Sequence, residues 1–117
     1  AGSSMNKQFN EILPGVFNKA LKAGVKIAFG TDAGGFPWTE NQAKEFTYMT
    51  QWGMTPMQAI KSATSVGAEL LDMGGKIGEI SAGAFADIIA VKDDPLKDIT
   101  SLQHVNFVMK DGKIYKP

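Results

Sequence analysis

The sequence predicts an α/β fold in which a mainly helical segment with one buried strand precedes a smaller β segment. Three observations support this prediction. Apolar residues recur at three- and four-residue spacing over residues 9–21, which is typical of an amphipathic helix. A continuous apolar run over 25–29 then leads into the glycine-bracketed turn 30–34, as a buried strand of a parallel unit does. After Gly75, short apolar runs alternate with Gly, Asp and Pro, a β composition.

The first helix is interrupted by Pro14. Proline fits the first turn of a helix and breaks an interior turn, so we place the main helix at 14–23. Residues 6–12 are then a preceding turn or a kinked extension. Gly24 is expected to end the helix, as a glycine just past the last turn commonly does.

Two further helices are predicted from start signals. TENQ from Thr39 and TPMQ from Thr55 both match the capping box, in which a Thr hydroxyl and a Gln three residues later satisfy each other's backbone donors. We therefore expect helices over 39–52 and 56–71, each followed by glycine.

The remaining elements are expected to be short strands. The Asp111-Gly112 pair between two of them is typical of a two-residue hairpin turn. The expected strands are 77–80, 87–91, 105–110 and 113–115.

Composition excludes several classes of protein. The 12 Lys and Arg residues balance 12 Asp and Glu residues and are scattered along the chain, so nothing indicates a nucleic-acid binder. No apolar run approaches the roughly 20 residues of a membrane span, and no signal peptide is recognisable. Cysteine is absent, which removes thiol chemistry and Cys-based zinc sites. We expect a soluble, cytoplasmic protein without membrane or nucleic-acid partners.

Four motifs, in this order, resemble the C-terminal end of metal-dependent amidohydrolases: GVKIAFGTDAG, TPMQAIKSATSVGAELL, IGEISAGAFADIIAVKDDPL and VNFVMKDGKIY. The resemblance is to the imidazolonepropionase and Xaa-Pro dipeptidase branch. It implies a (β/α)8 barrel, a TIM barrel, with a small β-sandwich. Because 117 residues fall short of the roughly 250 that a barrel needs, we expect a partial barrel, its final βα units, followed by part of the sandwich.

The resemblance also implies domain limits. Residues 5–75 are the expected barrel segment and 76–117 the expected β-sandwich segment. Residues 1–4, before Met5, are typical of the remnant of a cleaved expression tag and are set aside. Met5 is either a native start or a cloning boundary.

Asp32, in the turn 30–34, is the candidate catalytic residue. The resemblance implies that it binds a divalent metal, zinc in the family, and accepts the proton of the attacking water. A metal lowers the pKa of bound water to about 7, and a neighbouring carboxylate can then take its proton. The alternative is that Asp32 caps its own loop by bonding the amides of residues 33–35.

The resemblance also places the other metal ligands, a His-x-His pair, a carboxylated Lys or Glu and two further His, upstream of this chain. Zinc sites need three or four protein ligands, so we expect this chain alone to bind none. Many relatives carry His after the TDAG glycines in a phrase like FPH, where this chain has Trp38.

Other polar and aromatic residues favour structural roles. His104 is expected to be a surface or locally bonded residue, and Asp93-Asp94-Pro95 a turn. Ser62 and Ser65 lack a plausible base. The aromatic and Met residues are expected mostly in the core, with exposure left open for Trp38. This last group is Trp38, Phe46, Tyr48, Met49, Trp52, Met54, Met57 and Met73.

Two functions stay open. The chain is the C-terminal portion of a metal-dependent hydrolase of C–N bonds that is active only in a complete barrel, or it is a self-standing non-catalytic oligomeric module derived from one. A partial barrel exposes strand edges and apolar faces. We therefore expect a homo-oligomer, or a chain supplying the rest of the barrel.

Overall fold

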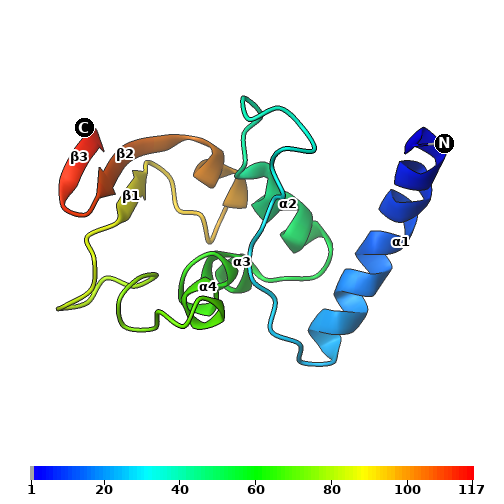
Figure 1. Cartoon of the computed structure of the whole chain (residues 1–117), viewed down its shortest axis with the longest axis horizontal. Helices are drawn as coiled ribbons and strands as arrows, with labels where there is room; N and C mark the ends of the chain where they lie inside the picture. The colour runs from blue at the N-terminus through cyan, green and yellow to red at the C-terminus, as the bar shows by residue number, and fades with distance from the viewer. Residues whose placement is uncertain (1) are drawn as a thin grey trace.

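The computed structural model describes the backbone of residues 2–117 and the side chains from Lys7 onward. The molecule is elongated, measuring 47 × 32 × 28 Å. The first helix lies at one end, three short helices form the middle, and a small sheet lies at the other end with the C terminus (Figure 1). The helices are α1 (Gly2–Lys22), α2 (Lys44–Gln51), α3 (Pro56–Ser62) and α4 (Ser65–Leu70). A mainly helical segment is thus followed by a smaller β segment, as predicted, although the strand predicted within the helical segment is absent from the described residues.

Helix α1 is longer than predicted. It runs unbroken through Pro14, so the proposed start at that residue is wrong. A proline inside a helix removes one hydrogen bond, here to the carbonyl of Asn10, and Asn10 is exposed, where water can replace that bond. The predicted end is confirmed: Gly24 has a positive φ of 80°, and the Val25 amide donates back to the Ala20 carbonyl.

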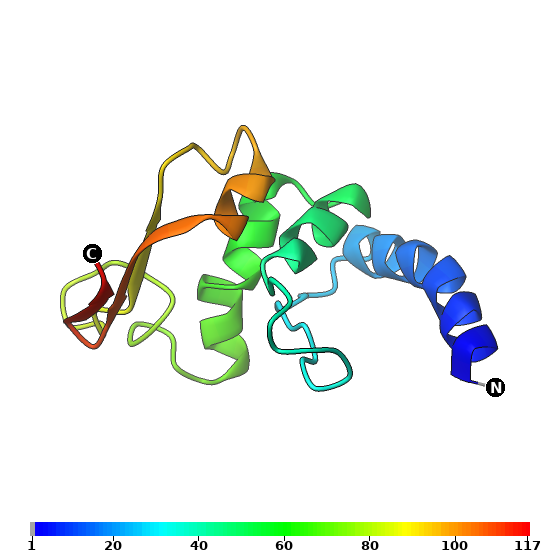
Figure 2. The same cartoon turned by 90° about the horizontal axis from the view of Figure 1, so that it is seen from above.

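Residues 25–29 do not form a strand in the described chain. This predicted strand is wrong as a hydrogen-bonded element, because a strand needs a neighbour for its backbone groups. From residues 26–29, the one backbone bond outside helices and strands is from the Phe29 amide to the Ser62 carbonyl, at 2.9 Å. The segment passes beside α3 and α4 as an unpaired chain (Figure 2).

The two capping-box matches have different outcomes. Thr55 caps α3 as predicted: its hydroxyl accepts from the Gln58 amide at 3.1 Å, and the Gln58 side chain accepts from the Thr55 amide at 2.9 Å. The start predicted at Thr39 is wrong, because α2 begins at Lys44 without a side-chain cap. Residues 39–43 form turns instead, and Gln42 bonds elsewhere.

The two capping-box matches make a paired test of stability. We expect Thr55→Ala to lower the free energy of unfolding by about 1 kcal/mol, the usual cost of losing an N-cap. Thr39→Ala is the control, and it should change the stability by only a few tenths of a kcal/mol. Urea denaturation of both variants measures the difference. Equal losses in the two variants would contradict the assignment of the cap.

The helix predicted over 56–71 is two helices. The chain breaks after Ser62, whose carbonyl accepts from the Phe29 amide instead of from the next helical turn. Thr64 has non-helical angles, φ −123° and ψ −96°, and its hydroxyl donates to the Ile60 carbonyl at 2.9 Å. The unpaired segment 25–29 thus takes a backbone acceptor from the helix, and no sequence pattern within 56–71 signals this.

A three-stranded antiparallel sheet follows, in the order β1-β2-β3. The predictions for these strands and for the Asp111-Gly112 turn are confirmed, with φ values of 48° and 77° as a two-residue hairpin turn requires. The strand predicted at 77–80 is wrong; residues 77–79 form bends and Ile80 has no regular secondary structure. The elements are β1 (Ile88–Val91), the 3-10 helix η1 (Ile99–Gln103), β2 (Val105–Lys110) and β3 (Lys113–Lys116).

Asp87 ties the start of β1 to the hairpin turn. Its carboxylate accepts from the Asp111 amide at 2.9 Å and from the Lys110 ammonium at 3.0 Å. These two bonds favour the ionised form and lower the pKa of Asp87 below its ordinary value of 3.8. The carboxylate therefore links the start of β1 to the hairpin turn between β2 and β3.

The pH dependence of stability follows from this lowered pKa. A group with a depressed folded pKa contributes stability above its unfolded pKa, and this is lost as the pH falls through the folded value. We expect Asp87→Asn to remove part of the loss of melting temperature between about pH 5 and about pH 2. Asp98, whose pKa is also lowered, stays in both proteins, so the difference reports Asp87. Parallel curves for the two proteins would contradict this role.

The core is small and lies among α2, α3 and the end of α1. Its buried apolar members are Met49, Met54 and Ala59. The chain exposes 8361 Å², about a third more than the roughly 6,200 Å² of a compact monomer of this mass. The partly buried residues packed on the core are Phe17, Leu21, Ile27, Phe29, Phe46 and Ile99.

Among the described residues, no helix is both long and apolar enough to cross a membrane.

Candidate functional site

Asp32 lies in the turn that follows the unpaired segment 25–29. Its φ of 54° is in the left-handed region, which Asp tolerates better than most residues. The side chain is exposed, and within the described part of the chain no hydrogen bond or ion pair reaches its carboxylate. The alternative that this carboxylate caps residues 33–35 therefore has no bond to support it. The oxygen atoms are available to a ligand from outside this chain.

The turn itself has few internal bonds. The Gly35 amide reaches the Asp32 carbonyl at 3.5 Å, and the Gly34 amide reaches the Phe36 carbonyl at 3.4 Å, both long for N–H···O bonds. The short contact is made by Thr31, whose hydroxyl donates to the side-chain oxygen of Gln42 at 2.6 Å. The Gln42 amide nitrogen in turn donates to the Glu40 carbonyl at 2.9 Å. The Gln42 side chain, eleven residues away, thus restrains Thr31, the residue before Asp32.

A small hollow of about 250 Å³ adjoins this contact. Burial raises the pKa of Glu45, which lines the hollow, above its ordinary value. Glu40 pairs with Lys44 on the same wall, at 3.7 Å. The hollow is lined by Thr31, Phe36, Glu40, Asn41, Gln42, Lys44, Glu45 and Tyr48.

The 40–42 segment also bonds to the C-terminal half of the chain. The Asn41 side chain donates to the Gln103 carbonyl in η1 at 2.8 Å, and the Gln103 side chain donates to the Thr47 hydroxyl at 3.3 Å.

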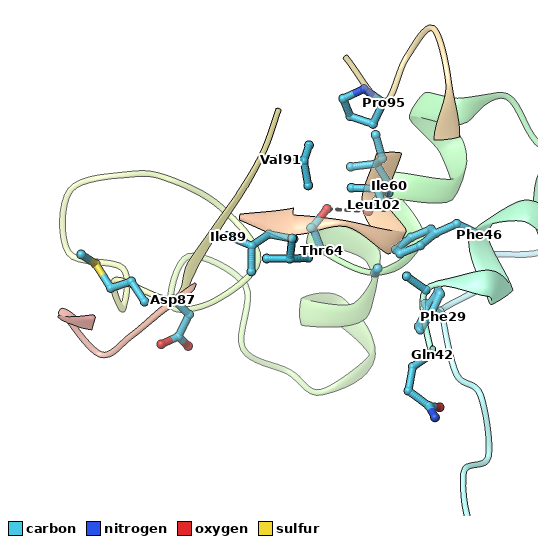
Figure 3. A pocket seen from close by; sticks show the side chains of 14 residues that line it. Phe29, Gln42, Phe46, Ile60, Thr64, Asp87, Ile89, Val91, Pro95 and Leu102 are labelled. Atoms are coloured by element: carbon cyan, nitrogen blue, oxygen red, sulfur yellow. Dashed lines mark hydrogen bonds between the residues drawn. The ribbon is translucent and has the colours of Figure 1, made fainter. Parts of the chain in front are cut away.

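A larger apolar cavity of about 620 Å³ lies between the helices and the sheet, with Gln42 and Asp87 toward opposite ends in the view of Figure 3. Phe29, Phe46 and Leu102 are among its apolar walls.

The described residues contain no group of three or more His, Asp or Glu side chains placed to hold a metal ion. Asp32 fits one position of such a site, because it offers an exposed oxygen donor with no competing protein partner. It does not make a complete site with any other described residue. Asp32 therefore offers at most one protein ligand to a metal from the described residues.

The other sequence candidates lie apart from Asp32 or have structural contacts. His104 is exposed at the end of η1, as predicted. Asp94 accepts from the Leu96 amide in a turn, also as predicted. Ser62 is buried and donates to the Ala59 carbonyl. Ser65 begins α4 and is exposed.

The expected aromatic and methionine core is confirmed only in part. Met49 and Met54 are buried. Tyr48 and Met57 are each 45% exposed, so their assignment to the core is wrong, and Trp38 is 76% exposed in the loop after the Asp32 turn. The contact between Thr31 and Gln42 was missed by sequence reasoning. Its only signal was the capping-box match at Thr39, whose glutamine was assigned to the wrong partner.

The family model described as "Amidohydrolase family" matches residues 15–115. The chain belongs to the amidohydrolase family. This confirms the resemblance inferred from the four motifs. Ochratoxinase from Aspergillus niger is 40% identical over 108 residues, covering 86% of this chain and 21% of the relative. A 5-methylthioadenosine/S-adenosylhomocysteine deaminase from Acetivibrio thermocellus is 35% identical over 115 residues, covering 80% of this chain and 27% of the relative.

Solved amidohydrolase structures agree with the fold. A Xaa-Pro dipeptidase crystallised with methionine in its active site is 48% identical, with a TM-score of 0.84 over 89% of this chain and 25% of that one. The crystal structure of Aspergillus niger ochratoxinase has 38% identity and a TM-score of 0.74, over 88% of this chain and 24% of that one. The chain therefore spans between a fifth and about a quarter of the length of the relatives it matches.

Proposed function

We propose that this chain provides the final βα units of an amidohydrolase (β/α)8 barrel, over residues 5–75, and part of its β-sandwich, over 76–117. In the completed enzyme it takes part in metal-dependent hydrolysis of an amide or another C–N bond. Membership of the amidohydrolase family and similarity to a dipeptidase and to ochratoxinase support this proposal. The chain alone is catalytically incompetent.

The observation that carries the proposal is the free carboxylate of Asp32. It follows an apolar segment, projects from a left-handed turn and has no partner within the described residues. Active sites of TIM barrels lie at the C-terminal ends of the strands, where residues 30–34 would lie once 25–29 pairs with neighbouring strands. Asp32 is therefore assigned as metal ligand and general base.

The chemistry needs two contributions. A divalent metal, zinc in the family, supplies Lewis acidity and brings the pKa of bound water to about 7. The Asp32 carboxylate accepts the proton that is lost as the nucleophile attacks the carbonyl carbon, and can return it to the leaving nitrogen. An exposed aspartate suits this role, because carboxylate oxygens can both ligate a divalent metal and accept a proton.

The exposed surface supports completion of the barrel by other segments. Residues 25–29 lack strand partners, and apolar residues of α1, including Phe9 and Ile12, are more than 60% exposed. Large exposed apolar areas mark surfaces that another segment or chain covers. The remainder of the barrel is the proposed cover. Self-association into a homo-oligomer is the alternative, and it accompanies the non-catalytic function.

Metal content and native mass of the purified chain test the proposal. We expect the 117-residue chain alone to carry no stoichiometric zinc and to hydrolyse no Xaa-Pro dipeptide. Joined to the first three quarters of the Xaa-Pro dipeptidase barrel, in place of the quarter it matches, it should carry zinc and cleave the dipeptide. Stoichiometric zinc bound through Asp32 in a homo-oligomer would contradict the need for a barrel. A well-folded joined protein that binds zinc but cleaves no C–N bond would favour the non-catalytic function.

A further inference from the structure

The turn 30–34 around Asp32 makes a shorter hydrogen bond to a side chain outside the turn than any of its own backbone hydrogen bonds. Its two backbone bonds are 3.4 and 3.5 Å long, whereas Thr31 bonds the Gln42 side chain at 2.6 Å. Both Thr31 and Gln42 are partly buried, which limits competition from water. Because Thr31 directly precedes Asp32, a shift in the position of Thr31 also shifts the direction of the neighbouring carboxylate.

Gln42 is held in a single orientation. A side-chain amide has one acceptor end and one donor end, and its neighbours decide which way it faces. The Glu40 carbonyl accepts from the nitrogen of Gln42 at 2.9 Å, so the oxygen faces the Thr31 hydroxyl. Turning the amide over would place two carbonyl oxygens against each other. The Gln42 side-chain oxygen is therefore the acceptor for the Thr31 hydroxyl.

The segment that carries Gln42 is itself restrained. The Asn41 side chain accepts from the Ala43 amide at 3.0 Å and donates to the Gln103 carbonyl at 2.8 Å, so it holds the turn 41–43 together and attaches it to η1. This arrangement explains why the TENQ sequence does not start a helix. Its glutamine, which a capping box would turn back to Thr39, points to Thr31 instead.

We propose that Gln42 is a positioning residue, which sets the direction of the Asp32 carboxylate through its hydrogen bond with Thr31. The inference rests on the proposed role of Asp32 as a metal ligand. Hydrogen-bond partners that orient a ligand commonly change metal affinity tenfold to a hundredfold when they are removed. Loss of this contact should therefore weaken metal binding by about tenfold or more.

The test compares four substitutions in the enzyme completed by the rest of its barrel, with Co²⁺ as the spectroscopic probe. Thr31→Val and Gln42→Ala each remove the contact, whereas Thr31→Ser keeps the hydroxyl. Thr100→Val is the matched control, because the Thr100 hydroxyl also donates at 2.6 Å, to Asp98, which lies outside the turn. We expect the first two to weaken Co²⁺ binding about tenfold and to change its visible absorption bands. Thr31→Ser and Thr100→Val should do neither.

A double variant and a ligand variant separate the possible failures. Thr31→Val and Gln42→Ala together should weaken Co²⁺ binding no more than either alone, because both remove the same bond. Unchanged affinity in both single variants, while Asp32→Asn loses Co²⁺, overturns the positioning role alone. Unchanged affinity in Asp32→Asn overturns the proposed role of Asp32 and this inference with it. In the 117-residue chain, unmoved NMR signals of Asp32 and Gly34 in Gln42→Ala also count against the positioning role.

Discussion

Replacing Gly78 by Ala should destabilise the chain by about 3 kcal/mol, the largest loss of stability we expect from a single added methyl group. A Cβ atom at this position would lie 2.4 Å from the Thr64 carbonyl oxygen and 2.6 Å from its carbonyl carbon. Both are backbone atoms at the break between α3 and α4, so neither can turn aside as a flexible side chain would. The φ of 76° adds strain for any residue with a Cβ.

Gly83 is the matched control for this prediction. Its φ of 90° is also positive, but a Cβ atom there would meet no other atom within 4 Å. Gly83→Ala should therefore show the backbone strain alone, about 1 kcal/mol. Chemical denaturation of both variants measures the difference, which we assign to the contact with Thr64. If both variants lose the same stability, the close approach of residue 78 to the α3–α4 break is not a constraint on folding.

Local signals in the sequence predicted the elements whose partners lie nearby in the chain. The Thr55 cap, the Gly24 helix end and the Asp111-Gly112 turn all depend on residues within five positions, and all three are confirmed. The failures involve contacts between distant segments. The break after Ser62 depends on the Phe29 amide, and the late start of α2 accompanies a bond between Gln42 and Thr31. Tertiary contacts override local propensity at these points.

The candidate site divides in the same way. The turn around Asp32 was recognisable because glycines follow an apolar run, and this pattern is contiguous in sequence. Whether the Asp32 carboxylate has a hydrogen-bond partner depends on distant segments, which the sequence pattern does not specify. The hydrogen bond of Thr31 likewise depends on the side chain of Gln42, eleven positions away. The apolar run itself did not reveal whether it has strand partners. Strand pairing is a property of two segments, and a single apolar run specifies only one of them.

Asp32→Asn in the completed enzyme should lower the rate of hydrolysis by about a thousandfold, within the range expected for removal of a positioned general base. Asparagine keeps the size of the side chain and tolerates a positive φ, so the turn should keep its shape. It cannot accept a proton at neutral pH, and its neutral oxygen is a weaker donor to a divalent metal. The expected loss is therefore chemical, with little change in the free energy of unfolding.

Asp72→Asn provides the control for this last prediction. Asp72 is also exposed, also has a φ of 54°, and lies in the turn after α4. The same substitution there changes the net charge and the turn residue in the same way, so it should leave hydrolysis within about twofold of the parent, as a surface change away from the site does. Steady-state kinetics with a Xaa-Pro dipeptide, together with zinc analysis, compares the two. If both variants keep the parent's activity, Asp32 is not a catalytic residue. If both lose activity equally, the loss comes from the change in charge or from folding. The two aspartates share the same φ, but only Asp32 follows the apolar segment 25–29.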